Sequence, residues 1–73
     1  MEHPTYSPVD GRTLAERRKA AGVTQDAVAE GIPTTRQALS RWERTTALPY
    51  VKAHKYLDAL TAAVEAEIPR AIA

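Results

Sequence analysis

The first regular pattern of apolar and polar positions begins at about Asp10. Leu14, Arg18 and Ala21 recur there at the spacing of one helical face, with polar side chains between them. Gly22 follows directly and suits the left-handed conformation that commonly ends a helix. The pattern predicts a first helix between Asp10 and Gly22.

A shorter helix is predicted before the third proline of the chain. Thr24 offers a hydroxyl that can cap a helix N-terminus, and the apolar stripe behind it consists of Val28, Ala29 and Ile32. Pro33 disfavours helical geometry at Ile32, so we expect this second helix to end there.

A third helix is predicted directly after Pro33. Residues 34–37 read Thr-Thr-Arg-Gln and fit the capping box, in which a Thr starts a helix and a Gln three residues later reaches back. Ala38, Leu39 and Trp42 form the expected inward side, so we assign Trp42 to the core.

The chain then predicts a loop over residues 44–49 and a last helix from about Tyr50 to Ile68, which Pro69 ends. The inward face expected for this helix comprises Tyr50, Ala53/His54, Leu57, Leu60/Thr61 and Val64. No stretch alternates long enough to predict a strand, so the fold class is all-α. Residues 1–9 are expected to form a flexible arm, residues 10–68 the domain and residues 69–73 a tail.

The composition of the 73 residues excludes several functional classes. The chain has no cysteine, no Ser/His/acid set, no phosphate-binding glycine loop and no cluster of residues with metal-ligand spacing. We therefore expect no enzyme activity, metal, cofactor or small-molecule ligand. No apolar run approaches the roughly 18 residues of a membrane span, and the N-terminus does not resemble a signal peptide. A cytoplasmic protein is expected.

The distribution of charge along the chain is more informative than the net charge. The formal net charge is +1, but residues 12–22 carry +3 and residues 33–55 carry +4, each flanked by acidic segments. Charge alone favours ordinary solvated helix faces. Concentrated on one face, however, these cations would behave locally like those of a nucleic-acid-binding protein.

Two short helices joined by a short turn, the second rich in Arg, Gln, Thr and Ser, form the helix-turn-helix arrangement, here at about residues 25–44. The run from Leu14 to Pro49 resembles the phage repressor and Cro type of helix-turn-helix domain, the XRE family. The resemblance rests on the segments RRKAAGVTQ, VAEGI and TTRQALSRWE. It implies a compact bundle of four or five helices of the lambda-repressor-like type. Such a bundle binds a palindromic operator in double-stranded DNA as a homodimer and regulates transcription, here as a nucleoid-associated repressor of the phage or mobile-element type.

The resemblance also implies roles for individual residues. The base-reading positions correspond to Thr35, Arg36, Gln37 and Arg41, with Ser40 nearby. The phosphate-contacting positions correspond to Gln25, Arg44, Thr45, Thr46 and Arg17. Arg18 and Glu43 occupy the positions of a partly buried ion pair between the first and third helices, so we assign them to folding. Arg suits guanine and Gln suits adenine in the major groove.

Several alternatives remain open at this point. The predicted third helix could be an ordinary solvated surface helix, and the residues do not decide which Arg reads a base and which holds a phosphate. The turn departs from the family, with Pro33 in place of the usual Gly and Thr34 in place of an apolar residue.

A different function on the same fold is an antitoxin or antirepressor-like protein-interaction module, which the near-neutral charge and the Ala-rich, acidic last helix would suit. For a homodimer, the candidate seam is the series of apolar positions Leu60, Val64, Ile68 and Ile72.

Overall fold

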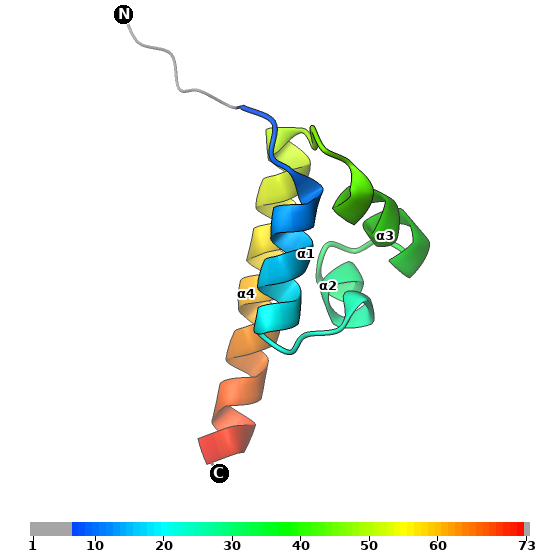
Figure 1. Ribbon diagram of the computed structural model, residues 1–73. Helices are drawn as coiled ribbons and strands as arrows, with labels where there is room; N and C mark the ends of the chain where they lie inside the picture. Colours follow the sequence, from blue (N-terminus) through cyan, green and yellow to red (C-terminus); the bar gives the residue numbers. More distant parts are fainter. Residues whose placement is uncertain (1–6, 73) are drawn as a thin grey trace, which may run out of the picture.

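The protein folds into four helices, seen here in a computed structural model that describes the backbone of residues 7–72 and the side chains of residues 7–66. The helices are α1 (Gly11–Ala20), α2 (Gln25–Gly31), α3 (Arg36–Arg44) and α4 (Tyr50–Ile72). α1 and α4 run alongside each other, and α2 and α3 lie together on one side of them (Figure 1). The described residues contain no strand, so the predicted all-α fold class is confirmed.

Local signals at the helix ends account for where α1 and α2 begin and end. The Asp10 carboxylate accepts a hydrogen bond from the Arg12 N–H at 3.0 Å and caps α1. Gly22 has a φ of +73°, and the N–H groups of Gly22 and Val23 donate to the last carbonyls of α1. Thr24 caps α2 by accepting from the Ala27 N–H at 3.2 Å. The ends predicted at Gly22 and Thr24 are confirmed.

The start of α3 differs by one residue from the capping box. The capping residue is Thr35, whose hydroxyl accepts from the Ala38 N–H at 3.1 Å. The box would have used Thr34, but the Thr34 N–H donates to the Ala29 carbonyl at 2.7 Å and holds Thr34 in the turn after α2. The turn closes back on α2, so helical geometry begins one position later than the motif suggests.

The core lies where all four helices meet. Its fully buried side chains are those of Leu14, Val28, Leu39, Leu48 and Tyr56. Leu48 belongs to the loop before α4 and pairs with Val9 in a single antiparallel bridge, whose two N–H···O distances are 2.9 and 2.8 Å. Val9 was expected in a flexible arm, and this bridge attaches it to the domain instead. Residues 1–6 of that arm lie outside the described part of the chain.

The buried face of α4 is wider than predicted and is centred elsewhere. Its buried side chains are Ala53, Tyr56, Ala59 and Leu60, with Leu57 and Val64 half-buried. Tyr50, His54 and Thr61, which were expected to face inward, are exposed. The reason is that α4 packs against α2 as well as α1: a Cβ placed on Gly31 of α2 would lie 3.0 Å from the Ala59 Cβ. Small residues let α2 and α4 approach closely, so the side of α4 that carries Ala53 and Ala59 lies in the core.

The last helix also ends later than predicted, because its backbone stays helical through Pro69 as far as Ile72. A proline has a helical φ and removes one backbone donor, so it weakens a helix without always ending it. The tail proposed for residues 69–73 is therefore helical up to Ile72, and Ala73 lies outside the described residues. Among the helices that the structure describes, none has the length and apolar character needed to cross a membrane.

Candidate nucleic-acid interface

The spacing of residues in α3 gives this helix one anchored side and one open side. Leu39 is fully buried and Glu43, four residues later, is 7% exposed. These two positions therefore fix which side of the helix faces the core. Arg36, Gln37, Arg41 and Arg44 are exposed, as is the capping residue Thr35, while Ser40 is half-buried. The structure thus brings the predicted base-reading residues together along α3, with Ser40 at the edge of the group.

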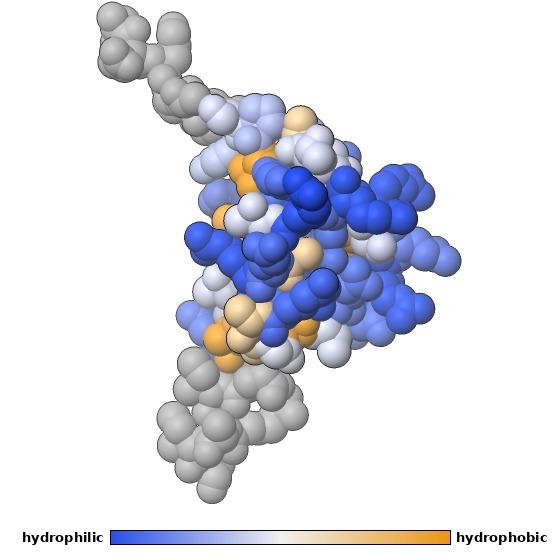
Figure 2. All heavy atoms as spheres, in the orientation of Figure 1, coloured by the Kyte–Doolittle hydropathy of each residue, from blue (hydrophilic) through white to orange (hydrophobic). Residues whose placement is uncertain are grey.

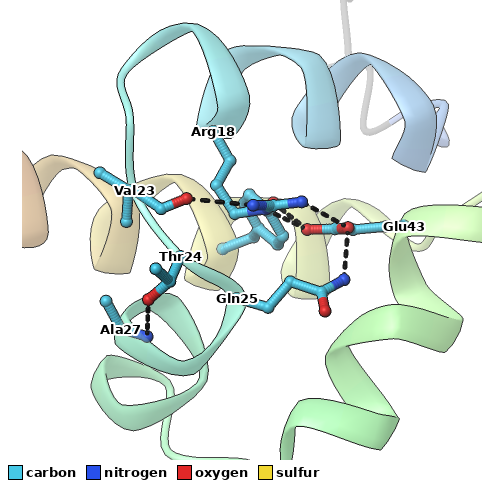
Figure 3. Close-up of polar contacts among 7 residues, drawn as sticks. Arg18, Val23, Thr24, Gln25, Ala27 and Glu43 are labelled. Atoms are coloured by element: carbon cyan, nitrogen blue, oxygen red, sulfur yellow. Dashed lines mark hydrogen bonds and ion pairs between the residues drawn. The ribbon is translucent and has the colours of Figure 1, made fainter.

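The anchor at Glu43 is a network that joins all four helices. Arg18 of α1 donates to the carboxylate through Nε at 2.7 Å and Nη2 at 3.2 Å. Gln25 of α2 donates through Nε2 at 2.9 Å, and Tyr56 of α4 donates through its hydroxyl at 2.5 Å. Figure 3 shows the guanidinium of Arg18 and the amide of Gln25 pointing at the Glu43 carboxylate. The ion pair that the resemblance implied between Arg18 and Glu43 is present.

Burial and hydrogen bonding oppose each other at this carboxylate. Burial alone would raise the pKa of Glu43, but hydrogen bonds from Arg18, Tyr56 and Gln25 outweigh it and leave that pKa below its ordinary value. Burial and the neighbouring carboxylate raise the pKa of Tyr56. Sequence reasoning missed Tyr56, although a tyrosine one helical turn after Ala53 on an apolar face was a usable signal.

Two of the expected phosphate contacts also have structural roles. The side chain of Gln25 is half-buried, and its amide donates to Glu43. The Thr45 hydroxyl donates to the Arg41 carbonyl at 2.8 Å, and the Thr45 carbonyl accepts from the Gly11 N–H at 2.8 Å. Thr46 is exposed in the loop beyond. The C-terminal end of α3 is thus tied to the start of α1.

A hollow of about 310 Å³ runs between α1 and α3 beside the exposed arginines. It is lined by Arg12, Ala15, Glu16, Lys19, Ser40, Glu43 and Arg44. Arg12 and Lys19 were not singled out from the sequence, because helical periodicity alone does not show which polar side of α1 faces α3. Arg17, the α1 residue that was expected to contact phosphate, lines a different hollow between α1 and α4.

Within the described part of the chain, the cations of this region differ in their pairing. Arg36 Nε lies 3.8 Å from Asp26 Oδ1 of α2, and both side chains are well exposed. Arg12 is paired with Asp10 at 3.3 Å. Lys19, Arg41 and Arg44 form no ion pair with a described residue. In Figure 2 hydrophilic side chains gather on the side of the molecule where α3 lies.

Trp42 borders the open side of α3. It is half-buried and packs against the core, in keeping with the core role predicted for it. The Nζ of Lys52, in the first turns of α4, lies 5.5 Å from the centroid of its ring. This cation–π contact places another positive charge beside the C-terminal half of α3.

Comparison with known proteins agrees with this geometry. A family model described as a helix-turn-helix domain matches residues 11–71, which covers α1, α2 and α3 whole and α4 except for its last residue. No curated protein and no solved structure matches the chain. With α2 and α3 in the two-helix arrangement and most of its length matched, the chain belongs to the helix-turn-helix domain family.

Proposed function

We propose that the protein is a sequence-specific DNA-binding regulator of transcription that reads the major groove with α3. The observation that carries this proposal is the division of α3 into a side anchored by Leu39 and Glu43 and an open side that carries three arginines and a glutamine. An α-helix fits the major groove, where Arg and Gln can each form paired hydrogen bonds to a base.

Gln37 and Arg41 are the central base readers in this proposal. They stand four residues apart on the exposed side of α3, directly opposite the buried pair Leu39 and Glu43. Arg36 lies next to them and is drawn toward Asp26. Thr35 and Ser40, at the two edges of the group, complete the proposed reading surface.

Phosphate contacts are proposed for residues that border this surface. Arg44 and Lys19 line the hollow between α1 and α3, with exposed side chains that are unpaired among the described residues. Gln25 and Thr46 are further candidates, whereas the Thr45 N–H already donates to the Trp42 carbonyl at 3.1 Å. Because Arg17 lies on the α4 side of α1, Lys19 takes the role first suggested for Arg17.

We further propose a homodimer on a palindromic operator, acting as a cytoplasmic repressor. The resemblance to phage repressors supports the repressor role. Of the seam first suggested, Leu60 is 7% exposed and packs largely in the protein's own core, and Val64 is half-buried. The side chains of Ile68 and Ile72 lie outside the described residues. The seam proposed here shifts toward α1 and is the hollow between α1 and α4, whose lining includes Leu57, Leu60 and Val64.

Selection of bound sites from random double-stranded DNA tests the proposal directly. The expected result is enrichment of one sequence with two half-sites related by a two-fold axis, since a symmetric dimer reads a symmetric site. Recovery of no preferred sequence at low salt would contradict the proposed function. Enrichment of a single unrepeated half-site would contradict only the dimer.

A further inference from the structure

A helix that lies in the major groove has a sugar-phosphate strand on each side, so a cation on either flank of α3 would meet phosphate. One flank is the hollow toward α1, where Arg44 and Lys19 lie. The other flank is the side of α3 that faces the start of α4. This inference rests on the proposed DNA-binding function and concerns how that second flank is supplied with charge.

The loop between α3 and α4 does not supply positive charge to this second flank. Residues 45–49 read Thr-Thr-Ala-Leu-Pro and contain no charged side chain. On α3 itself, Ala38 and Trp42 occupy this flank and are half-buried. The first cation after Arg44 is therefore Lys52, the third residue of α4.

Lys52 is held toward α3 rather than left to move freely. Its side chain is exposed, yet its Nζ lies 5.5 Å from the centroid of the Trp42 ring. Trp42 is itself fixed by packing against the core. The ring therefore restrains a long, flexible side chain and keeps its ammonium next to the helix that would enter the groove.

Helix stability does not account for a lysine at this position. The N-terminal end of a helix carries a partial positive charge, which opposes a cation in the first turn. Lys52 also forms no ion pair with any residue that the structure describes. Its charge is therefore available to an anion outside the protein.

From this placement we propose that Lys52, restrained by Trp42, contacts a DNA phosphate on the flank of α3 opposite Arg44 and Lys19. The ligand is a phosphodiester of the strand that borders the major groove on the α4 side. The contact strengthens binding to all sequences and reads no base.

The test is the salt dependence of binding to a duplex of the selected operator. Loss of one phosphate contact lowers the magnitude of the slope of log affinity against log salt by about 0.9, so a dimer that loses one contact in each subunit should show a fall of about 1.8. Lys52→Gln should show that fall, whereas Lys52→Arg should keep the wild-type slope. Lys55→Gln is the matched control. Lys55 is exposed on the same helix but lines a separate hollow with Gly31 and Ile32 at the end of α2.

An unchanged slope for a folded Lys52→Gln protein, or an equal fall for Lys55→Gln, overturns the assignment of Lys52 and leaves the proposed function standing. Thermal unfolding of each variant shows whether it has folded. If Lys52→Gln does not fold, the slope of Lys52→Met decides in the same way. Absence of any salt-dependent binding by the wild-type protein would overturn the proposed function and this contact together.

Discussion

At the scale of single residues, Glu43 shows how a buried charge can be accommodated in a very small protein. Each of its two carboxylate oxygens accepts two hydrogen bonds, from donors on α1, α2 and α4. An unpaired carboxylate in this position would be costly to bury, by several kcal/mol. The four donors offset that cost, and Arg18 keeps one donor for the Val23 carbonyl at 3.0 Å.

The first prediction concerns the pH dependence of stability. Because the pKa of Glu43 is lowered from 4.5 in the folded protein, the unfolded chain binds a proton more readily. The contribution of Glu43 is therefore fully present above about pH 4.5 and is lost as the pH falls below it. Urea unfolding across this range should show a smaller loss of stability on acidification for Glu43→Gln than for the wild type.

The titration of Asp10 does not affect this comparison. Hydrogen bonds from Arg12 also lower the pKa of Asp10, and Asp10 is present in both proteins. Its contribution therefore cancels in the difference. Parallel stability curves for the two proteins would show that Glu43 is not held in its charged form by the network.

A second prediction concerns Gly11, where α1 begins against the end of α3. A Cβ at this position would lie 2.0 Å from the Trp42 carbonyl oxygen and 2.9 Å from that of Thr45. Replacing a helical glycine by alanine ordinarily stabilises a protein by about 0.5–1 kcal/mol. Here we expect the opposite effect. Gly11→Ala should lower the free energy of unfolding by about 1–3 kcal/mol, because the start of α1 and the end of α3 must move apart.

Chemical unfolding of Gly11→Ala measures this effect, with Thr13→Ala as the control. Thr13 is exposed two residues further along the same helix, and its replacement is expected to change stability by less than about 0.5 kcal/mol. A Gly11→Ala protein as stable as the control variant would show that α1 and α3 do not need this close approach.

At the scale of the elements, features set by neighbours in sequence could be predicted and features set by packing could not. Gly22 and Thr24 act on backbone groups within a few residues, so the chain itself reveals the end of α1 and the start of α2. The inward face of α4 depends on how closely α2 packs on Ala59, which no local pattern shows. Tyr56 could have been placed from its spacing after Ala53, but the close approach at Gly11 could not be predicted, because its neighbours lie over thirty residues away in the sequence.

The candidate site was predictable to a similar extent. Periodicity separated an inward side of α3 from an outward one, and the resemblance supplied both the base-reading positions and the pair Arg18 and Glu43. The residues of α1 that lie beside α3 were harder to predict from the sequence. Whether Arg17 or Lys19 lies beside it depends on the rotation of α1 against α3, which is visible only in the folded protein.

A third prediction separates the two roles of α3. Arg41→Ala should weaken binding to the selected operator by about 1–3 kcal/mol and relax the preference at one base pair, since a base contact is lost. Arg44→Ala should weaken binding to every sequence alike and reduce the salt slope. Competition assays with single-base operator variants measure both effects. If both replacements change binding to the operator variants in the same way, Arg41 and Arg44 do not have separate roles in base reading and phosphate contact.

At the scale of the whole molecule, the cationic surface and the hollow between α1 and α4 lie on different sides of the protein. The cationic side belongs to α3 and the adjacent part of α1. A hollow of about 580 Å³ between α1 and α4 is lined by Ala20, Ala21, Leu57, Leu60, Thr61 and Val64, together with the exposed Arg17 and Glu65. In Figure 2 apolar residues are visible beside the lower end of α1, just above the grey part of α4. The cation and the anion that line this hollow suit pairing with a second copy in the reverse direction.

The fourth prediction tests this hollow as the dimer seam. Val64→Asp would bury a carboxylate in the seam, so we expect a monomer by light scattering at concentrations where the wild type is a dimer. Ala62→Asp is the control, because Ala62 is exposed on α4 but lines the hollow beside α2 instead. A wild-type protein that stays monomeric, free and on DNA, would contradict the proposed seam.

The anchoring of α3 also bears on how such a protein can change its target. The side-chain hydrogen bonds that join α3 to the other three helices all end on Glu43, and Arg36, Gln37 and Arg41 take no part in them. The outward positions can therefore be exchanged while the scaffold keeps its shape. In the proposed mode of DNA binding, recognition and folding therefore depend on different residues of this helix, and a few substitutions on its exposed side would give new DNA preferences without disturbing the fold.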